Sequence, residues 1–271
     1  MSFVPKIVGK VAITSDTHFN HGNIINYCDR FDFVSEDEKE FIIRERNSGG
    51  RPKVSHAAID KMNTSLIANW NSVITKDMDV IHCGDIAWMK EYSQIMELYS
   101  KLNFRNLYVV SGNHDDALWK FNGRRGYRHE LIRDVKEVKV FDSCMEMNVN
   151  GQHIFFSHYA NRVWPDSHRG SWNLYGHTHN GLYDDPYLLS MDVGVDSAKH
   201  LLGSYRPFLF TEIQDIMKKK KFVPINSMEI ESGEVVSNKY EYLALRADKI
   251  RLEAELAWCN DRRKQLIIKS L

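Results

Sequence analysis

The sequence has no excess of charge of either sign and no long apolar run. Its 36 Lys and Arg residues balance 36 Asp and Glu residues, so no global field draws the chain toward nucleic acid or anionic lipid. No run of about 18 apolar residues occurs, and the N-terminal segment MSFVPKIVGK contains no apolar signal core. These absences predict a soluble protein without a membrane partner, and any basic patch on it must be local.

Cysteine is also scarce, and no internal repeat is present. The cysteines lie far apart and form no C-x-x-C pair, which argues against both a zinc ribbon and a disulfide framework. They are Cys28, Cys83, Cys144 and Cys259. A reducing cytoplasm is therefore the expected location. The length of 271 residues and the hydrophobic content of 43% fit one main domain with a modest appendage better than two equal domains.

Short runs rich in β-branched and apolar residues predict buried strands, because each run ends where polar residues begin. These runs cover residues 11–15, 80–83, 107–111, 138–141 and 154–157. Between the first two runs, Ser55 could cap a helix in which apolar residues recur at helical spacing. These apolar residues are Ile59, Met62, Leu66, Trp70 and Val73. Strands that alternate with helices indicate an α/β layered fold.

The chain divides into a main domain and an appendage. The main domain is expected to span residues 1–217, with an insertion at 36–55 that is first charged and then loop-like. Residues 218–237 open with consecutive lysines and predict a linker, whereas residues 238–271 contain no Gly or Pro and predict one long helix. A seven-residue repeat could make this helix a contact in a homo-oligomer, and packing on its own domain is an equal alternative. The repeat consists of Leu245, Leu252, Cys259 and Leu266.

Short polar clusters follow apolar runs, at the points where strands should meet loops. They are Asp16-Thr17-His18, Gly84-Asp85, Gly112-Asn113-His114-Asp115, His158 and Gly176-His177-Thr178-His179. In an extended segment alternate side chains share a face, so Asp16 and His18 could bind one ion, and His177 and His179 an adjacent pair of ions. Each cluster alone is typical of a turn, but the whole set in this order indicates a metal site built from nitrogen and oxygen ligands.

As a set, the motifs D-x-H, G-D, G-N-H-D, S-H and G-H-T-H resemble the signature of calcineurin-like metallophosphoesterases. The resemblance extends from about residue 11 to residue 210, and segments such as SDTHFNHGNII and MDVGVD are similar to the small prokaryotic and phage-type members. It implies a four-layer α/β/β/α sandwich, in which two mixed β-sheets pack face to face with helices outside. In this chain the C-terminal helix would follow that sandwich.

The resemblance also implies a ligand set for two divalent metal ions. The first ion would be held by Asp16, His18, Asp85 and His179, and the second by Asp85, Asn113, His158 and His177. Asp85 would bridge, because the two oxygens of a carboxylate can span ions about 3.5–4 Å apart. This mixture of carboxylate, imidazole and amide ligands suits Mn²⁺ as the assay metal and leaves Fe²⁺, Ni²⁺ and Zn²⁺ open.

The activity that the resemblance implies is hydrolysis of a phosphate ester by in-line attack of a metal-bridging hydroxide. The leading substrate is a phosphodiester or a nucleotide, and a phosphomonoester is the alternative. A protein-binding scaffold of the same fold, without catalysis, is a further alternative. The presence of His114 together with the full ligand set argues against the scaffold.

His114 is expected to face the substrate, where it could protonate the leaving oxygen. Many protein-phosphatase members have a further aspartate shortly after the G-D motif, and this aspartate orients the histidine. Here Ile86, Ala87 and Trp88 follow Asp85 instead. Asp115 or a backbone group would therefore have to orient His114.

Other polar residues lie close in sequence to the ligands and could contact phosphate, with loop hydrogen bonding as the alternative. They are Asn20, His21, Arg162 and His168. Residues 119–133 combine basic and aromatic side chains, which could follow a nucleic-acid backbone and stack bases. A solvated basic loop is the favoured alternative, because the whole chain is neutral.

Overall fold

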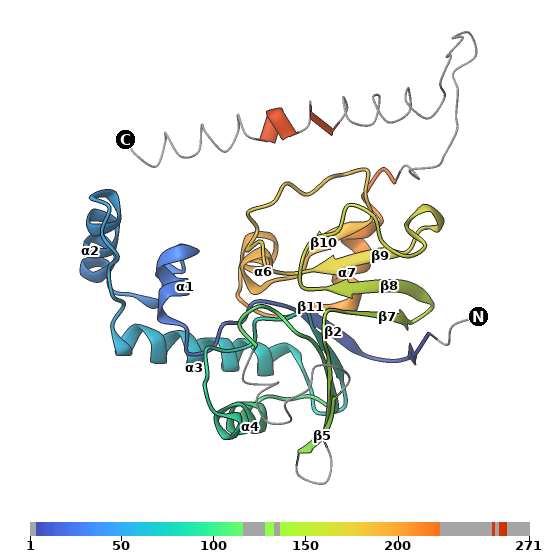
Figure 1. Cartoon of the computed structure of the whole chain (residues 1–271), viewed down its shortest axis with the longest axis horizontal. Coiled ribbons are helices and arrows are strands. Elements are labelled where there is room, and N and C mark those ends of the chain that lie inside the picture. The colour runs from blue at the N-terminus through green and yellow to red at the C-terminus, as the bar shows by residue number, and fades with distance from the viewer. Residues whose placement is uncertain (1–3, 116–127, 133–135, 223–250, 253–254, 259–271) are drawn as a thin grey trace.

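Two β-sheets form the centre of the fold (Figure 1) in a computed structural model that describes residues 4–115, 128–132, 136–222, 251–252 and 255–258. At the centre of one sheet, parallel strands lie in the order β2 (Val11–Thr14), β3 (Asp79–His82), β4 (Asn106–Val110) and β6 (Lys136–Phe141). Its edges are the antiparallel strands β11 (Phe208–Leu209) and β5 (Arg128–Ile132).

The other sheet has the order β1 (Lys6–Ile7), β7 (Cys144–Val149), β8 (Gln152–Ser157), β9 (Trp172–Tyr175) and β10 (Ser190–Asp192). Strands β8, β9 and β10 are parallel, and β7 pairs with β8 in the antiparallel sense. Because the carboxyl ends of parallel strands meet at one edge of a sheet, the loops that follow them are brought together. The predicted strand-end clusters lie on these loops.

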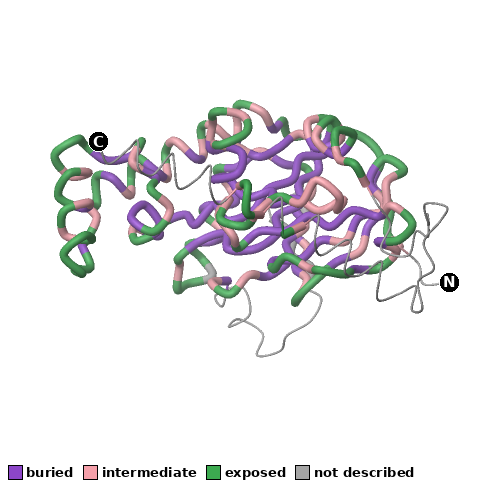
Figure 2. The backbone as a smooth tube through the Cα atoms, turned by 90° about the horizontal axis from the view of Figure 1, so that it is seen from above, coloured by how far each residue is buried: buried purple, intermediate pink, exposed green. Residues whose placement is uncertain are grey.

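Helices cover the six-stranded sheet on the face that points away from the other sheet. Those that pack there are α1 (Gly22–Tyr27), α3 (His56–Val73) and α4 (Tyr92–Lys101), while α2 (Glu36–Asn47) lies farther out (Figure 1). Leu66 and Trp70 of α3 share a buried cluster with Val80 and Leu107 of this sheet. Figure 2 shows that the strands are buried, whereas α2 projects at the periphery and buries only Ile42.

A second apolar cluster fills the space between the sheets. Alternation along β2 sends Ala12 to the helix-covered face and Ile13 to this cluster, where it meets Ile154 of β8. The helices α6 (Val195–Leu202) and α7 (Phe210–Met217) add Ala198 and Ile213 to the same cluster. The predicted α/β fold of two mixed sheets with helices is therefore confirmed.

The predicted elements agree with the structure. The five expected strands correspond to β2, β3, β4, β6 and β8, and the helix after Ser55 is α3. The Ser55 hydroxyl accepts a hydrogen bond from the Ala58 N–H, as a helix cap does. The insertion begins with α2, and the Glu38 carboxylate ties it to α3 by accepting from the Ser55 N–H at 2.6 Å.

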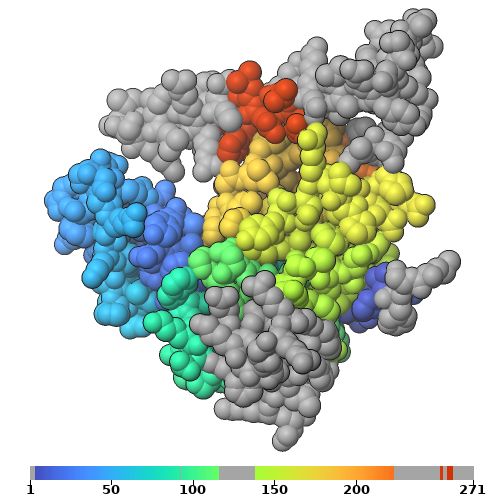
Figure 3. Space-filling view, viewed as in Figure 1, coloured from blue at the N-terminus to red at the C-terminus, as the bar shows by residue number. Residues whose placement is uncertain are grey.

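Most of the predicted linker at 218–237 and of the predicted helix at 238–271 lies outside the described residues. Residues 251–252 and 255–258 are the described part of that helix (Figure 3), and the Trp258 ring contacts Tyr183 with 6.2 Å between centroids. Self-association through this helix stays a prediction. None of the helices in the described part of the chain is long and apolar enough to cross a bilayer.

Candidate metal centre

The predicted ligands come from loops at the carboxyl ends of strands in both sheets. Asp16 and His18 follow β2, and Asp85 follows β3. Asn113 follows β4, His158 follows β8, and the segment with His177 and His179 follows β9. The structure brings their side chains into two groups of candidate metal ligands, Asp16 with His18 and His179, and Asp85 with His158 and His177.

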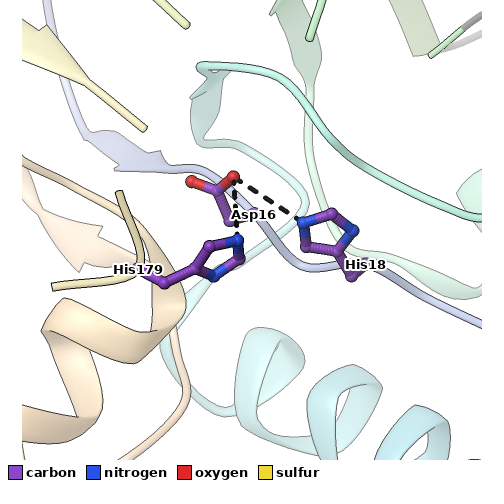
Figure 4. A group of neighbouring side chains, drawn as sticks. All are labelled: Asp16, His18 and His179. Carbon is purple, nitrogen blue, oxygen red and sulfur yellow. Dashed lines mark ion pairs between the residues drawn. The ribbon is translucent and has the colours of Figure 1, made fainter. Parts of the chain in front are cut away.

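The first group combines one carboxylate and two imidazoles (Figure 4). The Asp16 Oδ1 atom lies 3.8 Å from His18 Nε2 and 3.9 Å from His179 Nε2. These separations are too long for hydrogen bonds. They suit ligand atoms that each lie about 2.1 Å from a common ion, because such atoms are about 3–4 Å apart.

The second group is arranged around Asp85. Its Oδ2 atom lies 3.4 Å from His158 Nε2 and 3.5 Å from His18 Nε2 of the first group. The Asn113 Oδ1 atom lies 3.0 Å from His158 Nε2, which adds an amide oxygen to this side. One carboxylate oxygen therefore stands between the two groups.

Unpaired polar atoms test whether this pocket fits a metal ion. Asp16 Oδ1 and His18 Nε2 are buried, and neither has a hydrogen-bond partner. A buried polar atom without a partner costs about 1–3 kcal/mol, so such atoms point to a missing ligand. Both atoms face the space between the side chains of the first group, and their donor types are those of divalent transition metals. The residues fit the ion that the sequence predicts.

The backbone of these loops is left-handed, not extended. The φ angles of Asp16, His18, Asp85, His177 and His179 are all positive, between 48° and 67°. The expectation that Asp16 and His18 share one face of an extended segment is therefore wrong about the backbone, although the two side chains do converge. His177 and His179 belong to different groups, as expected for ligands of two adjacent ions. Such conformations cost about 1–3 kcal/mol each and cluster at functional sites.

Glycine is required where two ligand loops touch. A Cβ atom at Gly112 would overlap the Asp85 side chain, and one at Gly176 would overlap Asp16 and Ser15. Because no side chain separates them, the loops approach closely enough to form hydrogen bonds. His114 N–H donates to Asp85 Oδ1 and His177 N–H donates to Asp16 Oδ2, both at 2.8 Å. The glycines before the ligands thus allow close backbone approach, as the sequence suggests.

Asp115 joins two ligand loops through backbone contacts. Its carboxylate accepts hydrogen bonds from the N–H groups of Asp85, Gly112 and Ile86 at 2.7–2.9 Å. Burial raises the pKa of Asp115 to about 6, and these N–H donors oppose that rise. Through these contacts Asp115 fixes the loop that carries His114, which is a positioning role.

His114 lies on the side of the first group. Its ring centroid is 5.5 Å from that of His18, 5.6 Å from that of His21 and 5.0 Å from that of Trp88. The neighbouring Asn113 points instead toward His158. The two adjacent side chains therefore diverge, and the half-buried His114 ring is left beside the ligands.

Asp196 and Arg30 hold His179 in place, although no motif in the sequence predicts a role for either residue. His179 Nδ1 lies 2.7 Å from Asp196 Oδ2, so its Nε2 atom is the one that faces Asp16. Arg30 is 0% exposed and binds both Asp196 oxygens, at 2.7 and 2.9 Å. Its guanidinium also donates to the backbone carbonyls of Asp16 and Thr17. A carboxylate behind a ligating histidine fixes the tautomer and the ring orientation.

Asp192 braces the same loop from the other end of the segment MDVGVD. Its carboxylate accepts from the Thr178 hydroxyl at 2.5 Å, from the Asn180 N–H at 2.9 Å and from the Gly194 N–H at 2.7 Å. The signal available in the sequence was this segment, in which the two acidic residues, Asp192 at the end of β10 and Asp196, are four positions apart. The partners of those residues could not be read from the spacing.

Burial, ion pairs and hydrogen bonds shift the pKa values of the candidate ligands in opposite directions. Burial would lower the pKa of His158, but its hydrogen bond to Asp85 raises that pKa to about 9. The pKa of His179 rises to about 11 because the Asp196 contact outweighs burial. Burial and the nearby Arg30 hold the pKa of His18 far below its usual value, and burial raises the pKa of Asp16 to about 7.

The predicted phosphate contacts differ in position. His21 is buried beside the centre, with its Nδ1 atom 3.2 Å from His18 Nδ1. Asn20 is exposed; its N–H donates to Asn63, and its side chain lines a pocket of about 210 Å³ between α3 and α4. Arg162 is exposed on the loop that follows β8.

The structure does not bring His168 to the centre. It lies in the 3₁₀ helix Ser167–Arg169, and the adjoining Gly170 carbonyl accepts from Gln152 at the beginning of β8. His158 follows the opposite end of that strand. The expectation that His168 contacts phosphate is therefore corrected, because the loop after His158 returns along the sheet before His168 is reached. Of the basic and aromatic stretch at 119–133, only 128–132 lies within the described residues.

The fold and the two ligand groups define an α/β protein of two packed mixed sheets with a candidate metal centre at the loop edge. The chain belongs to the calcineurin-like phosphoesterase superfamily, whose domain profile matches residues 55–187. That stretch contains Asp85, Asn113 and the three ligand histidines that follow them in the chain, whereas Asp16 and His18 precede it. Membership supports a metal-dependent phosphoesterase in general, and superfamily members usually bind divalent metals.

Two further proteins are similar to this chain. An uncharacterised protein of Methanocaldococcus jannaschii is 31% identical over 158 residues, which cover 57% of this chain and 72% of that protein. The crystal structure of a protein of unknown function from Aquifex aeolicus superposes with a TM-score of 0.46 at 18% identity, covering 78% of this chain and all of that one.

Proposed function

We propose that this protein is a binuclear metal-dependent phosphoesterase that hydrolyses a phosphodiester or a nucleotide by in-line displacement. The observation that carries the proposal is the position of Asp85, whose Oδ2 atom lies 3.5 Å from His18 Nε2 and 3.4 Å from His158 Nε2. A carboxylate shared between two ligand groups is what a pair of ions requires. Mn²⁺ is the proposed assay metal, and the cytoplasm is the proposed location.

The residues that would hold the ions are those of the two groups. Asp16, His18 and His179 would hold one ion, while His158, His177 and Asn113 would hold the other. Asp85 would be shared between them. When bound, the ions supply positive charge for the ester and activate a water molecule for attack at phosphorus.

The protein groups around the ions have separate tasks. His114 is half-buried beside His18, and we assign it the transfer of a proton to the leaving oxygen. Asp115 holds the backbone of the His114 loop against the Asp85 loop. Asp196 and Arg30 keep His179 in the tautomer whose Nε2 lone pair faces the centre.

The test is hydrolysis of bis-p-nitrophenyl phosphate and of p-nitrophenyl phosphate with Mn²⁺, Fe²⁺, Ni²⁺ or Zn²⁺ added to metal-free protein. We expect turnover that depends on added metal and a higher kcat/KM for the diester. A preference for the monoester would favour a phosphomonoesterase instead. No turnover of either ester with any of these ions would overturn the enzymatic proposal and favour a binding scaffold.

A further inference from the structure

Two exposed aromatic side chains flank the candidate metal centre, one beside each ligand group. Trp88 is 49% exposed and lies beside His21 and His114. Tyr159 is 53% exposed and lies beside His158 and His177. Large aromatic side chains that stay exposed beside a site are candidates for ligand contact, because solvent exposure forfeits their burial energy.

The Trp88 ring has a fixed orientation. It stacks on the buried His21 ring at 4.7 Å between centroids with 15° between planes, and it forms a T-shaped contact with His114 at 5.0 Å between centroids. The Trp88 backbone N–H donates to the Phe19 carbonyl at 2.8 Å, which ties the loop after β3 to the loop after β2. Since the ring rests on His21 and remains half exposed, it offers a preformed flat surface to a ligand.

The Tyr159 ring is fixed from the opposite side of the centre. Its centroid lies 4.6 Å from that of His177 and 5.0 Å from that of His158, both in edge contacts. Its hydroxyl donates to Asn113 Oδ1 at 3.4 Å. Tyr159 directly follows His158, and Trp88 comes three residues after Asp85, so the ligand loops themselves place both rings.

We propose that Trp88 and Tyr159 bind the flat part of the substrate, which makes the substrate a phosphate ester of a nucleoside. The phosphate would lie at the metals, the base would stack on Trp88, and Tyr159 would form the facing wall. Base–aromatic stacking tolerates different bases, because every base has a π-face. This inference rests on the proposed function and specifies the substrate class of the same centre.

Binding of two phosphate monoesters to the Mn²⁺-loaded protein tests the inference directly. Adenosine 5′-monophosphate and methyl phosphate offer the same phosphate group to the metals, but only the first carries a base. Isothermal titration calorimetry should give a tighter Kd for the nucleotide by about 5- to 150-fold, the range that stacking of one base supplies. Uridine 5′-monophosphate should fall between the two ligands, because its ring is smaller.

Replacement of the two rings tests whether they cause the tighter binding of the nucleotide. Trp88→Leu with Tyr159→Leu should bring the ratio of the two Kd values close to one, while Trp88→Phe should retain most of it. Phe41→Leu changes an exposed aromatic side chain on the peripheral helix α2 and should leave the ratio as it is in the parent. A parent protein that binds both ligands equally, or a ratio that survives the double replacement, overturns the inference.

The same experiment separates this inference from the proposed function. If bis-p-nitrophenyl phosphate is hydrolysed but the Kd ratio is one, the phosphoesterase stands and the nucleoside site falls. If no ester is hydrolysed but the ratio depends on Trp88, the nucleoside site stands and the phosphoesterase falls.

Discussion

Replacement of Asp196 by Asn tests whether the residues behind His179 set both stability and metal affinity. The variant keeps the size of the side chain but removes its charge. Arg30, which is fully buried, then loses its anionic partner and one of the two side-chain oxygens that accept from it, and keeps neutral acceptors such as the backbone carbonyls of Asp16 and Thr17. Breaking a buried ion pair from one side costs about 3–5 kcal/mol. In a chain of this size each kcal/mol lowers the melting temperature by about 2–4 °C, so we expect a fall on the order of 10 °C.

The metal affinity should fall in the same variant for a separate reason. His179 loses the carboxylate that accepts from its Nδ1 atom at 2.7 Å, so neither its tautomer nor its ring orientation is fixed. Loss of such a partner typically weakens metal binding by about 10- to 100-fold. Thermal unfolding in a chelator measures stability without metal, and competition with a metal-binding dye measures affinity.

Two further variants separate these effects. Asp77→Asn removes an exposed carboxylate that pairs with Lys10, and it should change neither quantity. Arg30→Met combined with Asp196→Asn leaves no charge buried without a partner, so it should recover part of the stability that the single variant loses. The reasoning is refuted if Asp196→Asn melts like the parent. If it melts lower but binds metal normally, Asp196 supports the fold and not the centre.

Three shorter predictions address the centre and its surroundings. Asp85→Asn should lower the metal content measured by elemental analysis at both sites and abolish hydrolysis; two tightly held ions with normal turnover would contradict the shared ligand. The variant His114→Ala should keep its metals, and its kcat should fall by about 10²- to 10⁴-fold. Loss of metal in this variant would argue against the role assigned to His114. The buried His82 has its pKa lowered from 6.5 to about 3 by burial, so it folds in the neutral form. Below pH 6.5 the unfolded chain binds this proton and the folded chain does not, so stability should fall by about 2 kcal/mol between pH 6.5 and 5. His82→Gln should flatten that slope in urea unfolding, and an unchanged slope would remove His82 as the cause.

The strands and the position of the centre were predictable because both depend on local pattern. Each apolar run that ends in a polar cluster became a strand followed by a ligand loop, as with β3 and Asp85. Parallel pairing then brings such loops together whatever their separation along the chain. His177 and His179 belong to different ligand groups, as expected. The left-handed backbone at these residues was not expected.

The supporting contacts could not be predicted, since each joins segments that the sequence separates widely. Arg30 and Asp196 are 166 positions apart, and neither lies in a motif that specifies a partner for the other. The role of Asp115 was hidden for a different reason. Its side chain accepts hydrogen bonds from backbone N–H groups. Every residue except proline carries such a group, so the sequence does not reveal which residues donate.

The left-handed loops and their supports explain each other. Asp16 and His18 have positive φ angles, and the backbone carbonyls of Asp16 and Thr17 point into the interior. Buried carbonyls require hydrogen-bond donors. Arg30 supplies these donors by binding the carbonyls of Asp16 and Thr17. The same guanidinium fixes Asp196, and Asp196 fixes His179, so one buried charge supports two ligand loops from opposite sides.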